Sequence, residues 1–289
     1  MKIRRILSVF LLTVLMVSLM LTPQAYAMPA LEIKAKAAVL VDADEGRIIF
    51  GQNEQEREYP ASITKVMTAL LTLEAVDAGK LSLDQPITAS AVVNDQDPEG
   101  SSAGIEEGEV LTVEQLLYCL LLVSANEAAD ILAETVSGSR EAFVELMNQK
   151  AAELAMRSTH FCNPTGLHDP EHVSTVRDMA RLLRAAMQNE TFRAILSAGR
   201  YAVPATNLHP EGFTMTSTFW AELGDVSLRR GQFLGGKTGY TSAAGLCLAS
   251  AAQVKGKRYI LVTAGAKGNH GTEPYHIEDA VRVYRQLTR

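Results

Sequence analysis

The chain has 289 residues, of which 47% are hydrophobic and 21% are charged. This balance is that of an ordinary globular protein, long enough for one large domain or two modest ones. The formal net charge of −6 gives no reason to expect a nucleic-acid partner.

The first 27 residues are organised like a secretory signal peptide. A positively charged start precedes an apolar run over residues 6–21, and Ala25-Tyr26-Ala27 is a small-x-small cleavage site. The alternative is an uncleaved anchor, because the run is near the lower limit for spanning a membrane. Cleavage removes three positive charges and takes the net charge to −9. We therefore expect an acidic protein exported across the cytoplasmic membrane.

A hairpin and a helix are expected next. The strands Ala37–Val41 and Arg47–Phe50 flank a polar turn. Pro60 suits the first turn of a helix, where a missing N–H does no harm. The apolar stretch 66–78 continues this helix, and Gly79 can end it in a left-handed conformation.

Ser62 and Lys65 are three residues apart and are therefore neighbours on this helix. A serine hydroxyl becomes a good nucleophile only when another group accepts its proton. A lysine can do so if burial and neighbouring cations lower its pKa. The helix N-terminus adds a partial positive field where an oxyanion forms. The pair alone is weak evidence, because about one Ser-x-x-Lys arises by chance in a chain this long.

A block of helices is expected in the middle of the chain. Thr112 and Gln115 make a capping box for an apolar helix from Val113 to about Val123. Further helices are expected over residues 127 to about 136, after the cap Ser139, over 176–187 behind the Thr175 and Asp178 capping box, and over 190–197.

Beyond Tyr201 the pattern becomes extended. Strands are expected at Gly236–Tyr240, Gly245–Gln253 and Arg258–Ala264, followed by a closing helix over 276–287. Strands at both chain ends with helices between them predict an α+β fold. Its single antiparallel sheet is built from both ends of the chain, with an inserted helical subdomain. A cleft between sheet and helices is the expected place for a site.

No metal and no other cofactor is expected. The three cysteines match no zinc template and form no disulfide framework. His160, His168 and His172 lie near Asp169, which leaves a zinc site as an alternative. The H-E-x-x-H pattern is absent, however, and we favour a structural role for His168 and Asp169.

Three short motifs occur in order along the chain: Ser62-x-x-Lys65, Ser124-Ala125-Asn126 and Lys237-Thr238-Gly239. Each is weak alone. Together, at a helix start, an inter-helix loop and a strand, they resemble the active-site set of penicillin-binding proteins and serine β-lactamases.

The closer resemblance is to the D-alanyl-D-alanine carboxypeptidases, the low-molecular-mass penicillin-binding proteins. The segment 60–69 is similar to that family's first motif almost residue for residue, and residues 124–129 resemble its second. Asn163-Pro164-Thr165-Gly166-Leu167-His168 resembles a stretch typical of the family and not of β-lactamases. The resemblance covers residues 35 to about 270, and it implies the β-lactamase/transpeptidase-like fold.

The resemblance implies a serine D,D-carboxypeptidase. Such an enzyme removes the terminal D-Ala from peptidoglycan stem peptides through an acyl-enzyme, here on Ser62, and β-lactams inhibit it. Lys65 is the expected proton acceptor, and Ser124 is expected to relay the proton to the leaving amine. No metal is required.

Five further residues are expected to bind the substrate. Asn126 would hold the peptide backbone, and Lys237 would keep Lys65 neutral and attract the terminal carboxylate. Thr238 would hydrogen-bond that carboxylate, and Gly239 would let the substrate lie against the strand. The N–H groups of Ser62 and Tyr240 are the expected oxyanion hole.

The sequence departs from the family pattern in three places. We expect residues 28–289 to form a single catalytic domain, with a helical insertion at about 62–200 and without the C-terminal β domain and membrane anchor of many relatives. Membrane attachment therefore stays open. Residues 206–234 are unlike the family pattern, and the middle residue of the second motif is Ala125.

Three alternative functions remain. A D,D-endopeptidase cutting peptidoglycan cross-links shares all three motifs. A catalytically silent protein that binds penicillin or wall fragments is a different class, against which the intact Ser62, Lys65 and Lys237 argue. A β-lactamase is disfavoured, because no acidic residue stands in a recognisable loop to activate water.

Overall fold

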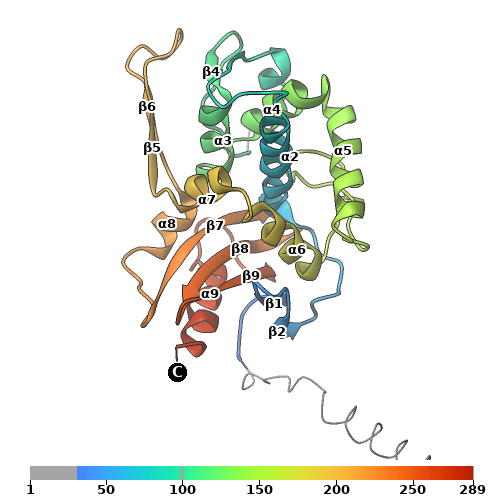
Figure 1. Ribbon diagram of the computed structural model, residues 1–289, viewed down its shortest axis with the longest axis vertical. Coiled ribbons are helices and arrows are strands. Elements are labelled where there is room, and N and C mark those ends of the chain that lie inside the picture. The colour runs from blue at the N-terminus through green and yellow to red at the C-terminus, as the bar shows by residue number, and fades with distance from the viewer. Residues whose placement is uncertain (1–30, 98–99, 289) are drawn as a thin grey trace, which may run out of the picture.

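The computed structural model describes residues 31–97 and 100–288 (Figure 1). The expected signal peptide lies outside these residues. Strands from the N-terminal and C-terminal regions of the chain form one antiparallel sheet in the order β2-β1-β9-β8-β7, which confirms the predicted α+β fold. Its strands are β1 (Ala37–Asp42), β2 (Ile48–Gln52), β7 (Gly231–Thr241), β8 (Gly245–Val254) and β9 (Lys257–Ala266).

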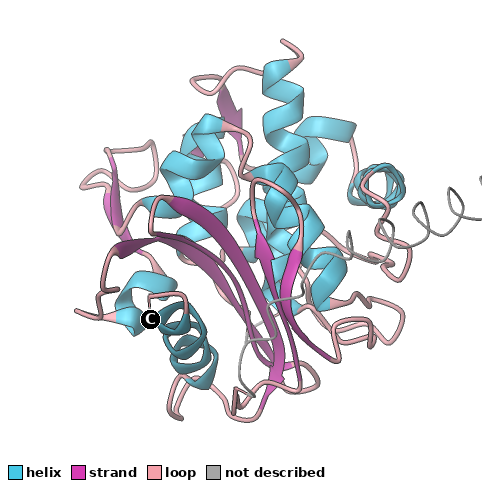
Figure 2. Ribbon diagram, turned by 60° about the horizontal axis from the view of Figure 1, so that its bottom comes forward, coloured by secondary structure: helices cyan, strands magenta, loops and turns pink. Residues whose placement is uncertain are grey.

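Helices cover both faces of this sheet (Figure 2). Strand β1 is buried along its whole length, and its side chains alternate between the two faces. Val39 and Val41 join the larger core, which is formed with the central helical block, whereas Leu40 joins the smaller core beneath the last two helices. A strand covered on both sides therefore reads as a continuous apolar run.

The predicted helical block is present. Its helices are α2 (Lys65–Asp77), α3 (Val113–Leu122), α4 (Asn126–Ser137), α5 (Arg140–Glu153), α6 (Val176–Ala186) and α7 (Glu190–Ser197). The capping box of Thr112 and Gln115 forms as predicted, and Gly138 ends α4 in a left-handed conformation with φ +85°. On the other face lie α8 (Thr218–Leu223) and α9 (Tyr275–Gln286).

The chain between α7 and β8 was only partly predicted. It contains the hairpin β5 (Arg200–Val203) and β6 (Phe213–Thr216), then α8, and a β7 that begins at Gly231 rather than Gly236. Two glycines in β7 obscured the strand pattern. A Cβ on Gly235 would come within 2.2 Å of the Leu196 carbonyl oxygen, and one on Gly236 within 2.6 Å of the Phe219 ring. Glycine is therefore required there so that α7 and α8 can approach the sheet.

Short elements complete the fold. They are the 3₁₀ turns η1 (Ala61–Thr64) and η2 (Ala91–Asn94) and the two-stranded sheet of β3 (Pro86–Thr88) and β4 (Val110–Thr112). The α-helix predicted to begin near Pro60 therefore starts as a 3₁₀ turn and becomes α-helical at Lys65. Across residues 31–97 and 100–288, we find no helix with the length and apolarity needed to cross a membrane.

Candidate active site

Ser62 lies in η1, one turn before the start of α2. The three-residue spacing brings Lys65 Nζ to 3.1 Å from Ser62 Oγ, although the connecting turn is 3₁₀ rather than α-helical. Ser62 opens into a cleft between η1, the loop before α4 and the edge strand β7. The described residues lining this cleft are Ser62, Ser101, Ser124, Thr218, Glu222, Thr238, Gly239, Tyr240, Leu246, His270 and His276.

Lys65 is fully buried, and three oxygen atoms surround its amine. Nζ donates to Asn126 Oδ1 and to the Thr165 carbonyl oxygen, both at 2.7 Å, and the third neighbour is Ser62 Oγ. A neutral amine carries two hydrogens and one lone pair. When both hydrogens go to Asn126 and Thr165, the lone pair is left facing the Ser62 hydroxyl.

The electrostatics of the site favour this neutral amine. Burial, and then the positive charge of Lys237, lower the pKa of Lys65 well below its usual value, against the opposing effect of Asp130 and Glu127. Burial also lowers the pKa of Lys237 to about 7, and the Glu222 carboxylate opposes that shift. Both effects favour the neutral amine of Lys65, which is the form that can accept a proton.

The second motif brings Ser124 and Asn126 to the same cleft. Asn126 begins α4, and its main-chain N–H donates to the Ser101 carbonyl at 2.9 Å. Its Nδ2 lies against Gly100, where a Cβ would come within 2.5 Å. Ser124 has a φ of +65°, an uncommon conformation for a residue with a Cβ. Its buried hydroxyl has no hydrogen-bond partner among the described residues, so the hydroxyl remains available to a substrate.

The third motif lies on the edge strand β7. Lys237 is fully buried and donates to the Thr238 carbonyl at 2.8 Å. Thr238 Oγ1 lines the cleft, 2.7 Å from Thr218 Oγ1 of α8. Gly239 lies against the turn that carries Ser62, because a Cβ there would come within 3.0 Å of Ser62 N. The glycine thus lets strand and turn approach, a requirement separate from the predicted contact with substrate.

The loop before α6 supplies the backbone that holds Lys65. Asn163 Oδ1 accepts hydrogen bonds from the N–H groups of Thr165 and Gly166 and from the Thr165 hydroxyl. This turn directs the Thr165 carbonyl at Lys65. Gly166 has a φ of +84°, and a Cβ on it would lie 2.0 Å from the Ala61 carbonyl oxygen. The sequence identified this segment by resemblance, but a main-chain acceptor has no sequence signature.

A buried histidine ties the same loop to the start of α2. His172 Nδ1 accepts a hydrogen bond from the Cys162 N–H at 3.1 Å, so the proton of the neutral ring lies on Nε2. Nε2 donates to Thr64 Oγ1 at 2.9 Å. Burial lowers the pKa of His172 to about 4. Within residues 31–97 and 100–288, no group of three or more His, Cys, Asp or Glu side chains is placed to hold a metal ion.

Acidification is expected to destabilise the fold through His172. An unfolded histidine protonates near pH 6.5, whereas this one resists protonation until about pH 4, so the unfolded state binds more protons between these values. Stability is therefore lost as the pH falls from about 6.5 toward 4, by up to roughly 3 kcal/mol. Urea unfolding across this range measures the loss.

The matched variants are His172→Asn and His160→Asn, since His160 is exposed. His172→Asn should be less stable at pH 7 and should show a weaker pH dependence, while His160→Asn should follow the unchanged protein. Equal pH dependence in all three proteins would contradict this role for His172.

Two further residues beside the cleft, Glu222 and His276, were not predicted. Glu222 of α8 pairs with the buried His276 of α9, with 3.0 Å between Oε2 and Nε2. His276 Nδ1 is buried and has no partner among the described residues. The Tyr240 ring packs edge-on against His270, with ring centroids 4.9 Å apart. No local pattern marks Glu222 and His276, because they lie 54 positions apart and only the packing of α8 and α9 joins them.

Glu127, next to Asn126, was also missed. Its buried carboxylate oxygen Oε1 accepts hydrogen bonds from Ser102 Oγ at 2.8 Å, from the Ala103 N–H at 2.6 Å and from the Gly104 N–H at 3.1 Å. These bonds fix the loop that carries Ser101 into the cleft. Glu127 thus positions one wall of the site.

Comparison with known proteins agrees with the motifs. Residues 23–268 match the peptidase family described as D-alanyl-D-alanine carboxypeptidase. The D-alanyl-D-alanine carboxypeptidase DacF of Bacillus subtilis is 34% identical over 274 residues, or 91% of this chain and 66% of the relative. A D-alanyl-D-alanine endopeptidase of Pseudomonas aeruginosa is 30% identical, over 89% of this chain and 78% of the relative. The chain thus spans just under two thirds of the length of DacF.

The fold is likewise that of known penicillin-binding proteins. Penicillin-binding protein D2 from Listeria monocytogenes, solved in a cefotaxime-bound form, superposes with a TM-score of 0.76. The two sequences are 28% identical, and the match covers 91% of this chain and the full length of the Listeria chain.

Proposed function

Because the chain belongs to the D-alanyl-D-alanine carboxypeptidase family of serine peptidases, we propose that it removes the terminal D-Ala from peptidoglycan stem peptides through an acyl-enzyme on Ser62. β-Lactams would inhibit it by acylating the same serine. The observation that carries this proposal is the environment of Lys65, whose two hydrogen-bond acceptors leave its lone pair for the Ser62 hydroxyl.

Acylation begins when Ser62 Oγ attacks the carbonyl carbon of the penultimate D-Ala and Lys65 Nζ takes the hydroxyl proton. The N–H groups of Ser62 and Tyr240 are proposed to receive the oxyanion. The peptide C–N bond then breaks as Ser124 relays to the leaving amine the proton that Lys65 took from Ser62, which returns Lys65 to its neutral form. Water attacks the ester, releases the shortened peptide and restores the hydroxyl of Ser62.

Substrate binding is assigned to the residues around this centre. The side-chain amide of Asn126 would hold the peptide backbone, and Thr238 Oγ1 would bond the terminal carboxylate. Lys237 is fully buried, so its charge would attract that carboxylate mainly through the local field. Gly239 keeps the strand close to Ser62, and it would let the substrate lie against the strand.

A product assay tests the proposed reaction. The purified chain is incubated with a stem pentapeptide ending in D-Ala-D-Ala and, separately, with a cross-linked muropeptide dimer. We expect one D-Ala per pentapeptide, little cleavage of the dimer, and neither product from Ser62→Ala. Faster cleavage of the dimer would instead establish the D,D-endopeptidase, an activity named for the Pseudomonas relative. No product and no β-lactam adduct would point to a silent binding protein.

The cellular setting is part of the same proposal. We infer that residues 1–27 direct export and that residues 28–289 act as one catalytic domain on the outer side of the cytoplasmic membrane. N-terminal sequencing of the exported protein tests this inference, with Met28 expected as the first residue. An intact N-terminus on the exported protein would favour the anchor instead.

A further inference from the structure

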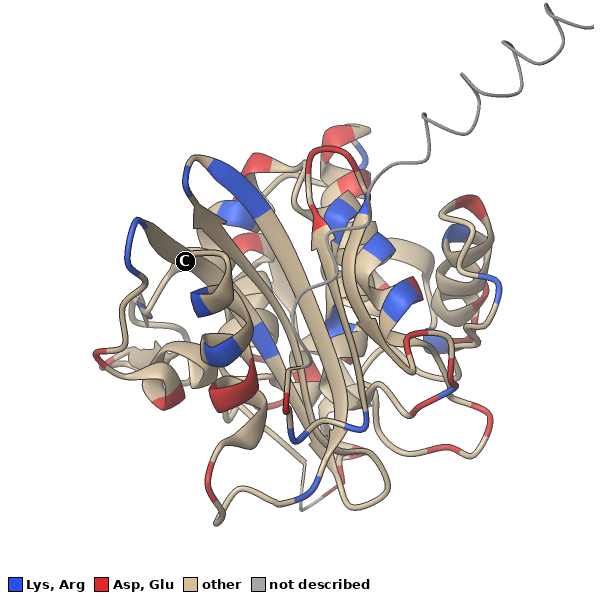
Figure 3. Cartoon of the chain, turned by 90° about the horizontal axis from the view of Figure 1, so that it is seen from below, with Lys and Arg blue, Asp and Glu red and all other residues tan. Residues whose placement is uncertain are grey.

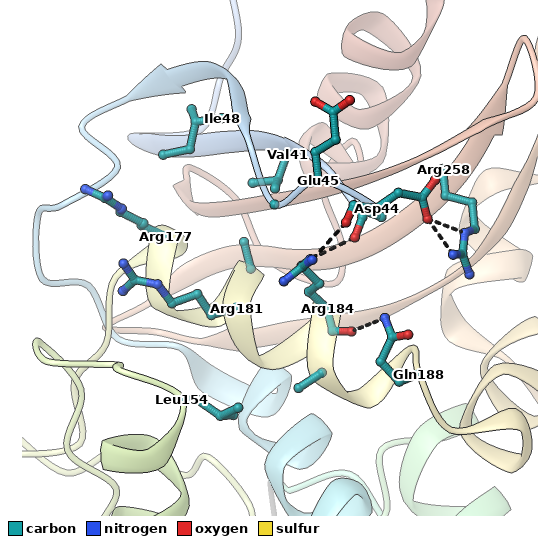
Figure 4. A pocket seen from close by; sticks show the side chains of 14 residues that line it. Val41, Asp44, Glu45, Ile48, Leu154, Arg177, Arg181, Arg184, Gln188 and Arg258 are labelled. Atoms are coloured by element: carbon teal, nitrogen blue, oxygen red, sulfur yellow. Dashed lines mark hydrogen bonds and ion pairs between the residues drawn. The ribbon is translucent and has the colours of Figure 1, made fainter.

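A second groove lies along helix α6, away from the Ser62 cleft. It has a volume of about 910 Å³ and runs between α6, the turn after β1 and the edge strand β2. It shares no lining residue with the cleft. Figure 4 shows Arg177, Arg181 and Arg184 on the side of α6 that borders the groove, with Arg184 reaching the turn at Asp44.

The groove carries a positive excess. Four arginines and two acidic residues line it, and both acids are already paired: Asp44 with Arg258 and Glu45 with Arg47, which lies outside the groove. On the side of the molecule seen in Figure 3, basic and acidic residues are interspersed. Arg181 and Arg258 face the carboxylates of Asp178 and Asp44, so Arg177 and Arg184 carry the positive excess, which attracts anions locally on a chain with a net charge of −6.

The arginines of α6 keep donors free for a ligand. The Arg177 guanidinium has no hydrogen bond or ion pair to any described residue, although its side chain is only half-exposed. Arg184 donates from Nε to the Ala43 carbonyl and from Nη2 to the Asp44 carbonyl, which leaves Nη1 unused. Arg181 donates from Nη1 to the Asp178 carboxylate and to the Ala155 carbonyl, so its Nε and Nη2 remain unused.

Arg184 is also held in place before any ligand arrives. Its guanidinium lies against Gly46, where a Cβ would come within 3.2 Å of Cζ, so the turn closes directly on the side chain. Two carbonyl bonds and this contact fix the planar group. A preorganised arginine loses less conformational entropy when it binds an anion.

We propose that the groove beside Arg177, Arg181 and Arg184 binds a linear phosphodiester polymer. The three residues recur at intervals of four and three, about 6 Å and about 4.5 Å along the helix axis, so they present a row of donors rather than one pocket. The free guanidinium fork of Arg177 can take two oxygens of one phosphate, while Arg181 and Arg184 add the donors that their protein contacts leave unused. A single small anion would engage only part of this row.

The lining also favours a polymer without bases. None of the described residues around the groove is aromatic, so nucleobases would find no stacking surface. The apolar contacts available come from aliphatic side chains such as Ile48 and Leu154. Such a surface suits a polyol phosphate chain, and binding one would retain the protein beside the polymer without using the Ser62 cleft.

Binding is measured by fluorescence anisotropy with an end-labelled poly(glycerol phosphate) of about ten units, at salt concentrations from about 50 to about 200 mM. The test variant is Arg177→Gln/Arg184→Gln. The control is Arg229→Gln/Arg230→Gln, which removes the same charge from two exposed residues outside the groove. We expect the groove variant to bind at least about tenfold more weakly, and its salt dependence to fall by about one unit per lost contact.

Arg184 also supports the turn at Asp44, so Arg177→Glu alone is the second test, since its guanidinium makes no contact that folding requires. Unchanged melting and unchanged acylation of Ser62 by benzylpenicillin keep this test separate from the proposed reaction. Equal losses in groove and control variants, or no binding at about 50 mM salt, would overturn the proposal. Equally tight binding of poly-glutamate, or of inorganic phosphate, would overturn the assignment to a phosphodiester polymer.

Discussion

Replacing Lys65 by methionine is expected to slow acylation of Ser62 by benzylpenicillin by on the order of 10³-fold. Methionine fills much of the same buried volume but cannot accept a proton, so Ser62 Oγ loses its proposed base at 3.1 Å. Asn126 Oδ1 and the Thr165 carbonyl also lose their donor. Time-resolved intact mass gives the rate, with Lys80→Met as the control, because Lys80 is exposed and distant in sequence from every motif.

Lys65→Arg separates proton acceptance from charge. Arginine stays protonated and therefore supplies a cation without a base. We expect it to be as slow as Lys65→Met. If Lys65→Arg acylates within about tenfold of the unchanged protein, a positive charge next to Ser62 is sufficient and the assignment of Lys65 as the base is wrong.

Gly166→Ala is expected to cost at least about 3 kcal/mol of unfolding free energy and to reduce acylation of Ser62 by at least about 100-fold. Two effects add here: the left-handed conformation at φ +84° and a Cβ placed 2.0 Å from the Ala61 carbonyl oxygen. The clash can be relieved only by moving the turn that holds Ser62 or the loop that directs the Thr165 carbonyl. Urea unfolding and the penicillin acylation rate measure the two losses.

Gly138→Ala is the matched control. Gly138 has nearly the same φ, +85°, but a Cβ on it would meet no atom within 4 Å. It should lose only the cost of the backbone conformation, about 1–2 kcal/mol, and keep its acylation rate. If the two variants are equally stable and equally active, the contact between Gly166 and Ala61 does not position Ser62.

The sequence was sufficient to predict which motif side chains the fold brings together. Ser62 with Lys65, Ser124 with Asn126, and Lys237 to Tyr240 each lie in a local pattern, and the fold brings all three groups to one cleft. The sheet was predictable for a related reason. Its central strands are covered on both faces and read as continuous apolar runs.

What the sequence missed depends on packing between distant segments. The Thr165 main-chain carbonyl accepts a hydrogen bond from Lys65, and a main-chain acceptor cannot be predicted from residue type. Glu222 and His276 meet only because α8 and α9 pack on the same face of the sheet. The first part of β7 was not predicted because Gly235 and Gly236 interrupt the strand pattern. These glycines allow the strand to pack closely against Leu196 and Phe219. Such contacts emerge from tertiary structure rather than from local propensity.

The central claim is that Ser62 is the nucleophile, and the most direct test is the intact mass of the protein after exposure to benzylpenicillin, followed by a peptide map. The account predicts one covalently bound drug molecule per chain, located on Ser62, and no adduct on Ser62→Ala. An adduct on another residue, or no adduct while the drug stays intact, would contradict it.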